Sequence, residues 1–270
     1  MTFKRLLPMI LLPLAGAGPA LAGDVDEVMR LANSGQYQQA AALGRNCGTP
    51  ECLAQGAGAL SVLGGYVASE AERQPVLREA VTLATKARRR AEAEGATDDD
   101  LMALIYFQEG QALGRLAETL PEEERRDYAE PVREAFEEAL KHDPQRWEAH
   151  AGLANWHAKV MVAADSLAGG IGAFLANVIY DATFEEAKMH RDMAAAISKP
   201  PAEEKVFLLE SAEIRLLLDE NGMAEVARQD LEASLAIEPP NHLSRAVHQI
   251  ATTCLEDMPG CAERLRDALQ

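Results

Sequence analysis

The sequence has few aromatic residues and no long apolar run beyond its first 22 residues. Aromatic residues make up 5% of the chain, and no segment alternates apolar and polar residues between hairpin turns, which argues against a strand-rich fold. After residue 22 no stretch is apolar over the roughly 18 residues that a membrane-spanning helix needs. The helix formers Ala, Leu, Glu and Arg are abundant. The sequence therefore predicts an all-α fold.

Basic residues are scarce relative to acidic ones. The chain has 26 Lys and Arg against 43 Asp and Glu, which gives a formal net charge of −17. A field of this sign repels nucleic acid and anionic lipid, so neither is expected as a partner. The acidic surface favours a solvated helical exterior, and a cationic partner is the alternative.

The first 22 residues have the pattern of a secretory signal peptide. Lys4 and Arg5 precede the apolar run Leu6–Leu14, and an A-x-A site ends at Ala22. The prolines of this segment argue against a buried helix. Cleavage after residue 22 would remove only Lys4 and Arg5 among charged residues and change the net charge from −17 to −19. We expect an exported, periplasmic, soluble protein.

The four cysteines form two close pairs, Cys47 with Cys52 and Cys254 with Cys261. In an oxidising compartment an even number of cysteines favours disulfides, and of the three possible connectivities the local one demands least of the fold. Metal binding is the alternative, but neither pair has C-x-x-C spacing or a histidine beside it. Each pair brackets a predicted helix break, at 48–50 and at 258–260.

Turn signals divide the chain into about six helix hairpins. Gly, Pro and short polar stretches separate apolar-periodic segments, and an array of hairpins suits residues 23–270 better than one compact core. The expected helix pairs are Asp24–Asn33 with Tyr37–Arg45, Glu51–Ser69 with Val76–Glu94, Leu101–Leu120 with Tyr128–Asp143, the two halves of Trp147–Pro200, Phe207–Asp219 with Met223–Ile237, and His242–Glu256 with Cys261–Leu269.

Residues Tyr128–Asn241 resemble the tetratricopeptide repeat (TPR) family. The segment A-F-E-E-A-L-K-H-D-P, which ends at Pro144, matches the second helix of a repeat. The pattern that follows is similar to the subgroup found in regulator of microtubule dynamics proteins and their bacterial relatives. The similarity is based on Ala149-His150, Leu153, Trp156 and Val160, then a long insert, then Ala182-Thr183, Glu186-Ala187 and Pro200.

The resemblance implies a right-handed α-solenoid of about six antiparallel hairpins that binds another protein and has no catalytic residues. The export signal departs from the subgroup, so microtubules are not inferred. The expected organisation is a signal peptide at 1–22, irregular hairpins at 23–127, TPR-like repeats at 128–241 with an insert at 162–182, and a capping hairpin at 242–270.

The insert is the distinguishing feature of the chain. Its segment Ile171–Tyr180 is strongly apolar and contains Phe174. Exposed on a monomer it would form an interface patch. It either folds back to plug the concave face or packs on a partner, which could be a second copy of the chain.

Two functions from different classes follow. The first is a scaffold that binds a protein or peptide through its concave face, where we expect Asn155, Lys159, Arg215 and Asp219 because they are polar residues on otherwise apolar helices. The alternative is a carrier of a small apolar ligand in a pocket closed by the insert at 171–180. Trp156, Phe174 and Tyr180 are candidate binding residues in either case.

No enzyme or cofactor site is predicted. His150 and His157 lie two turns apart on one predicted helix face, and His190 lies on the partner helix of the same hairpin. A zinc site needs three or four ligands with fixed geometry, and helix packing explains the pair better. The glycines Gly169, Gly170 and Gly172 lack the strand and the Lys-Ser/Thr of a phosphate loop. No nucleophile and base are suggested by spacing.

Overall fold

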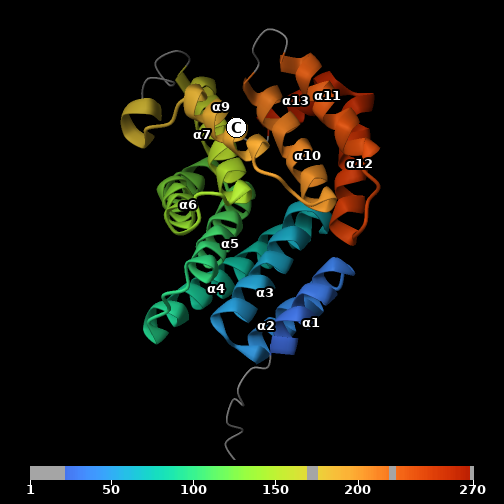
Figure 1. The fold of residues 1–270 in the computed structure, drawn as a ribbon. Coiled ribbons are helices and arrows are strands. Elements are labelled where there is room, and N and C mark those ends of the chain that lie inside the picture. The colour runs from blue at the N-terminus through green and yellow to red at the C-terminus, as the bar shows by residue number, and fades with distance from the viewer. Residues whose placement is uncertain (1–21, 169–175, 219–222, 268–270) are drawn as a thin grey trace, which may run out of the picture.

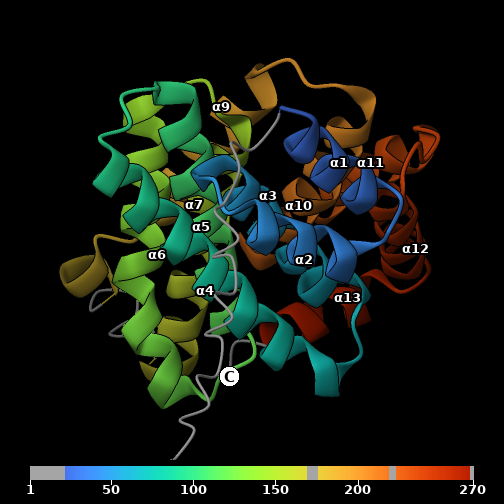
Figure 2. The same ribbon diagram turned by 90° about the horizontal axis from the view of Figure 1, so that it is seen from below.

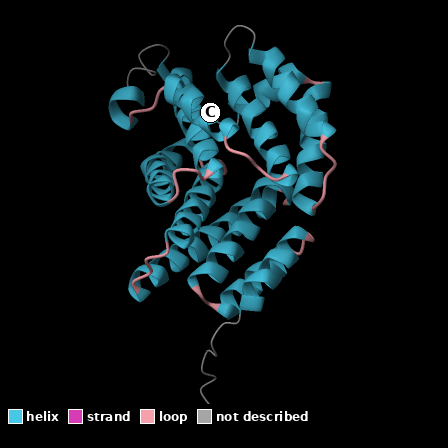
Figure 3. Cartoon of the chain, viewed as in Figure 1, coloured by secondary structure: helices cyan, strands magenta, loops and turns pink. Residues whose placement is uncertain are grey.

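The computed structural model describes residues 22–168, 176–218 and 223–267, and within these ranges the regular secondary structure is helical with no strand (Figure 3). The prediction of an all-α fold is confirmed. None of the helices in these ranges is both long and apolar enough to cross a membrane.

Twelve numbered α-helices and one π-helical segment make up the described fold (Figure 1). A short helical stretch also spans 176–180. The elements are α1 (Ala22–Asn33), α2 (Tyr37–Cys47), α3 (Pro50–Val62), η1 (Leu63–Val67), α4 (Glu70–Glu94), α5 (Asp99–Ala117), α6 (Glu122–His142), α7 (Trp147–Ala168), α9 (Phe184–Ala196), α10 (Pro201–Leu218), α11 (Met223–Ala236), α12 (His242–Glu256) and α13 (Met258–Asp267).

Two helices begin before their expected starts at Val76 and Tyr128. Helix α4 begins at Glu70, where Ser69 and Glu72 form a capping box, and it continues through Pro75. Helix α6 continues through Pro131, so the boundary expected between residues 127 and 128 lies within one helix. A proline removes one backbone hydrogen bond, and packing of the helix on both sides offsets this cost. Helix α7 likewise extends to Ala168, beyond the expected start of the insert at 162.

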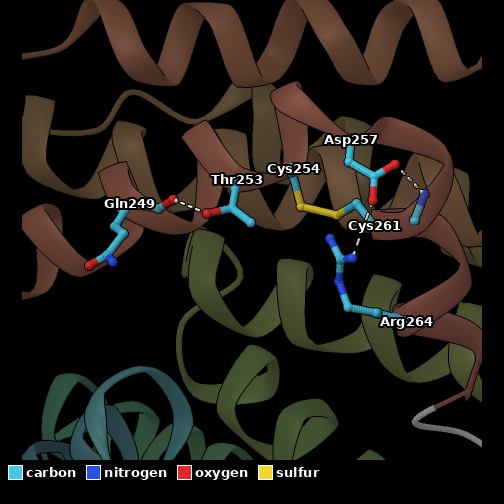
Figure 4. The surroundings of a disulfide bond; sticks show 7 residues. Gln249, Thr253, Cys254, Asp257, Cys261 and Arg264 are labelled. Carbon is cyan, nitrogen blue, oxygen red and sulfur yellow. Dashed lines mark hydrogen bonds and ion pairs between the residues drawn. A yellow bond between two sulfur atoms is a disulfide. The ribbon is translucent and has the colours of Figure 1, made fainter.

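The C-terminal hairpin turns at Asp257, one residue before the predicted break (Figure 4). The Asp257 carboxylate accepts a hydrogen bond from the Gly260 N–H at 3.0 Å and lies 3.4 Å from Arg264. A side-chain acceptor at this position caps a helix, and proline is tolerated in the first turn. Met258, Pro259 and Gly260 therefore begin α13 and do not form a break.

Both predicted disulfides are present. Cys47 pairs with Cys52 across the turn between α2 and α3, with 6.2 Å between their Cα atoms. Cys254 pairs with Cys261 across the turn between α12 and α13, with 5.1 Å between their Cα atoms (Figure 4). Each disulfide therefore connects the two helices of a short turn near one end of the described chain.

The helices pack as consecutive pairs, and alternate helices also touch. Each helix contacts the next one along the chain, and contacts run in succession through α1, α3, α5, α7, α10 and α12. These are the first helices of the six hairpins. Each first helix therefore contacts both the second helix of its own hairpin and the first helix of the next hairpin.

The N-terminal and C-terminal hairpins meet (Figure 2). The Tyr37 hydroxyl lies 3.1 Å from His242 Nδ1, and the two rings pack edge to face. Tyr66 of η1 packs against the buried cluster formed by α10, α11 and α12. The first and last hairpins of the described chain are therefore in contact.

Glycine permits the closest helix crossing, between α2 and α3. A Cβ added at Gly44 would lie 2.5 Å from the backbone oxygen of Cys52 and 3.2 Å from the Cα of Gly56. We expect Gly44→Ala to lower the free energy of unfolding by about 2–3 kcal/mol, because two backbones would have to separate. Urea denaturation followed by circular dichroism measures this change.

Gly114→Ala is the matched control. Gly114 lies in α5, and the nearest atom to an added Cβ is a Val132 methyl at 3.6 Å, an ordinary contact. Alanine is the better helix former, so this variant should gain about 0.5–1 kcal/mol. Equal effects of the two substitutions would show that the α2–α3 crossing does not require glycine.

Candidate functional site

A partly open cavity of about 280 Å³ lies between the helices. Its walls come mainly from α5, α6 and α7, and Val206 and Glu210 of α10 complete them. Tyr66 of η1 and Leu243 of α12 contribute from the two ends of the chain that meet. The aromatic residues that line the cavity are Tyr66, Phe107, Tyr128, Phe136, Trp147, Trp156 and Tyr180.

Four of the predicted binding residues line this cavity: Asn155, Trp156, Lys159 and Tyr180. The first three lie on α7, as the predicted groove residues of a first helix should. The Trp156 indole N–H donates to the Ala129 carbonyl of α6 at 2.7 Å, so the ring is fixed in place. Sequence reasoning therefore identified one wall of the cavity.

The other three predicted residues are not part of the described cavity. Arg215 lies on the face of α10 that packs on α11, where its Nε is 2.7 Å from Asp230 Oδ2, so it does not line the cavity. Asp219 and Phe174 lie outside the described residues. The polar character of Arg215 reflects an ion pair between two helices, which the sequence pattern alone does not distinguish from a groove position.

The described part of the insert has two faces. Ala176 is buried, and Tyr180 packs with the core cluster of α6 and α7 and lines the cavity. Val178 and Ile179 are 62% and 63% exposed. One face of this short segment therefore closes the cavity while the other presents two large apolar side chains to solvent.

A charged network forms one side of the cavity. Glu118 at the end of α5 pairs with Lys159 of α7 and lies 3.6 Å from Arg115. Burial alone would raise the pKa of Glu118, but the positive charges of Lys159 and Arg115 outweigh it and lower the pKa from 4.5 to about 2. The Glu118 carboxylate is therefore ionised at all physiological pH values.

A second carboxyl in the same network, that of Glu213, has its pKa shifted in the opposite direction. Burial raises the pKa of Glu213 on α10 from 4.5 to about 7, and the nearby carboxylates of Glu210 and Glu118 add to this effect against Lys159 and Arg115. Glu210 also accepts a hydrogen bond from the Tyr66 hydroxyl at 2.9 Å. The network thus joins η1, α5, α7 and α10, whose residues are far apart in the sequence.

Arg125 is the least satisfied cation of the cavity wall. Its Nη2 donates to the Leu120 carbonyl at 3.2 Å, but its Nε and Nη1 atoms are buried without a hydrogen-bond partner. The Oδ1 atom of Asn155 is also buried and unpartnered. Unpaired buried polar atoms are costly, so a hydrogen-bond partner for these atoms would be stabilising.

Sequence reasoning missed Tyr66, Arg115, Glu118 and Arg125. Arg125 lies between two segments interpreted as separate helices, and no local motif marks it. Arg115 and Glu118 are three residues apart on α5. Their contacts with η1, α7 and α10 form only when these elements pack together. No signal in a single sequence identifies such contacts.

Four side chains from α7 and α9 meet away from the cavity. His150 Nδ1 lies 2.9 Å from His190 Nδ1, and the rings of His157 and His190 stack with centroids 5.9 Å apart. Burial lowers the pKa of His157 and of His190 to about 4, so both rings are neutral near pH 7. Glu186 lies beside His190, with its Oε2 3.8 Å from His190 Nε2.

Comparison with protein-family models and with curated proteins finds no match to this chain.

Proposed function

We propose that this protein is a non-catalytic binding protein that holds a small, largely apolar ligand in this cavity. The observation that carries this proposal is an apolar, aromatic-lined space of about 280 Å³ with a few unpartnered polar atoms in its wall. Ligand sites have this character: mostly apolar walls, and a small number of polar groups that orient the ligand.

The proposed fold of this binding protein is a TPR-like right-handed α-solenoid. The contacts between the first helices of successive hairpins support this fold. The contact between Tyr37 and His242 joins the ends of the array. A cavity of about 280 Å³ suits a compact ligand better than an extended peptide.

The polar atoms indicate which group the ligand carries. The Nε and Nη1 atoms of Arg125 each have an N–H without an acceptor, and a charge-assisted hydrogen bond from either one to a carboxylate oxygen is strong. Asn155 Oδ1 can accept a hydrogen bond from a donor on the same ligand. The best fit is an apolar molecule with one carboxylate.

A protein or peptide partner is the second candidate function. Exposed Val178 and Ile179 favour it, since adjacent apolar side chains on a surface mark interfaces. A second copy of the chain could bind there. The pattern of residues 1–22 together with two disulfides supports export to an oxidising compartment such as the periplasm for either function.

Decanoate binding tests the first candidate. Both tryptophans of the chain, Trp147 and Trp156, line the cavity, so ligand entry should change the intrinsic fluorescence. We expect decanoate to bind more tightly than decanol. Arg125→Gln should weaken decanoate binding by about 10–100-fold and leave decanol binding nearly unchanged, because a hydrogen bond to a charged group contributes about 1.5–3 kcal/mol.

Arg89→Gln is the control, because Arg89 is an exposed arginine of α4 that does not line the cavity. Native mass spectrometry of the purified protein would reveal a co-purifying ligand directly. If neither decanoate nor decanol changes the tryptophan fluorescence and no small molecule co-purifies, the ligand-carrier function is wrong and the protein-partner function gains support.

A further inference from the structure

Helices α7 and α9 bring three metal-ligating side chains together. His157, Glu186 and His190 each offer a ligand atom, and these atoms lie within 4.8 Å of one another. His157 is buried, and the other two are partly buried. None of the three lines the cavity, so this cluster is independent of the proposed ligand.

The hydrogen bonds around His150 assign the proton positions in this cluster. A carbonyl oxygen only accepts, so His150 Nε2 must donate to the Pro144 carbonyl, which lies 3.1 Å away. Neutral His150 then has its lone pair on Nδ1. Its neighbour at 2.9 Å, His190 Nδ1, must therefore carry a proton and donate it.

This assignment leaves the lone pair of His190 on Nε2. That atom faces Glu186 Oε2 at 3.8 Å, so two lone-pair-bearing atoms lie next to each other in a partly buried site. They need a donor or a cation between them. A ligating histidine commonly donates its other N–H to a fixed acceptor, as His190 does to His150.

We propose that His157, Glu186 and His190 bind a divalent transition-metal ion of the Zn²⁺ class, with His150 as the positioning residue for His190. Two imidazole nitrogens and one carboxylate suit Zn²⁺, Co²⁺ or Ni²⁺ and not Mg²⁺ or Ca²⁺. Three protein ligands leave one position of a tetrahedral ion open.

Glu186 is the metal ligand that was not predicted from the sequence. His157 must give up one contact on metal binding: its Nδ1 accepts a 3.3 Å hydrogen bond from the Thr183 N–H. This is a long bond, so its loss costs little. Either Nδ1 binds the metal in place of Thr183, or the ring proton moves to Nδ1 and Nε2 binds.

Metal titration of the protein prepared without a histidine tag and stripped with a chelator tests the site. Calorimetry with Zn²⁺ should give about one ion per chain, and Co²⁺ should give the absorption bands of a tetrahedral complex. Glu186→Gln and His190→Gln should each weaken Zn²⁺ binding by more than about 100-fold, since changes to outer-shell groups alone cost 10–100-fold.

Matched controls come from the same chain. Glu185→Gln changes the exposed neighbour of Glu186, and His142→Gln changes a histidine that pairs with Asp99 elsewhere. Both should bind Zn²⁺ as the parent protein does. His150→Gln should weaken binding by about 10–100-fold and shift the Co²⁺ bands while the stoichiometry stays at about one.

Thermal denaturation separates loss of the site from loss of the fold. Zn²⁺ should raise the Tm of the parent protein and of both controls, but not that of Glu186→Gln, whose circular dichroism should match the parent protein. The site is refuted if the parent protein binds no stoichiometric Zn²⁺ or Co²⁺, or if Glu186→Gln and His190→Gln bind Zn²⁺ as tightly as the parent. The histidines then serve packing alone.

Discussion

Glu213→Gln is expected to raise the free energy of unfolding by about 2–3 kcal/mol at pH 8. Burial and nearby carboxylates raise the pKa of Glu213 from 4.5 to about 7 in the folded protein, so at pH 8 its ionised form is held at a cost. Glutamine has the shape of the protonated side chain and removes this cost.

The pH dependence of this stabilisation follows from the number of protons that the folded and unfolded chains bind. Because the folded-state pKa lies above that of the unfolded chain, the folded protein binds more protons between pH 4.5 and pH 7, and its stability rises as the pH falls through this window. The gain from Glu213→Gln should therefore shrink to under about 1 kcal/mol at pH 5. Urea denaturation at both pH values measures the difference.

Glu232→Gln is the control, because Glu232 is an exposed glutamate of α11. Its effect should stay within about 0.5 kcal/mol at either pH. A gain from Glu213→Gln that is equal at pH 5 and pH 8 would contradict the argument, since it would come from something other than ionisation.

Glu118 gives the opposite dependence in the same network. Its pKa is lowered to about 2 by Lys159 and Arg115, so its contribution to stability is complete above pH 4.5 and is lost as the pH falls towards 2. The two glutamates differ because Glu118 contacts Lys159 directly. Stability should be greatest near pH 5, where neither carboxyl is in its unfavourable form.

Local sequence signals predicted the helices and the disulfides well. Thr49 and Asn241 stand at helix starts and accept backbone hydrogen bonds there. The cysteine pairs required only that each short turn fold as expected. The errors concern helix starts: α4 begins at Glu70 and runs through Pro75, where packing on neighbouring helices overrides a local preference, and α6 begins at Glu122.

The candidate sites were only partly predictable, because they depend on contacts between distant segments. One face of α7 carries Asn155, Trp156 and Lys159, and helical spacing identified it. The opposite wall needs Tyr66 to reach Glu210, a contact across 144 residues. Contacts between residues so far apart in the sequence depend on how the hairpins stack, and the sequence of a single hairpin does not specify this stacking.

Part of the histidine cluster could have been predicted from the sequence. His150 and His157 were recognised as neighbours on one helix face. Glu186 and His190 are four residues apart, so they share a face of α9, and that spacing was visible. What the sequence did not give is the orientation of α9 against α7, which joins the two faces.

Lys205→Ala is expected to lower the free energy of unfolding by about 3–5 kcal/mol. Lys205 of α10 is fully buried, and burial lowers its pKa. Its ammonium donates to the carbonyls of Ser234 and Ile237 at 2.5 and 3.0 Å, and to His248 Nδ1 at 3.1 Å. Alanine removes the packed stem and leaves three acceptors unpaired.

Lys205→Met separates the two contributions. Methionine keeps most of the apolar stem but has no donor, so the difference between Met and Ala reports packing and the difference between Lys and Met reports the hydrogen bonds. Lys86→Ala, at an exposed position of α4, is the control and should cost under about 0.5 kcal/mol. Thermal and urea denaturation measure all three variants.

The contacts of Lys205 also predict which helices lose stability when its side chain is replaced. Two of the acceptors, Ser234 and Ile237, lie at the end of α11, and the third, His248, lies on α12. Amide hydrogen exchange should therefore accelerate first in α11 and α12 of Lys205→Met. If Lys205→Met is as stable as the parent protein, the buried ammonium contributes no net stability, and its three hydrogen bonds only balance the cost of burying the charge.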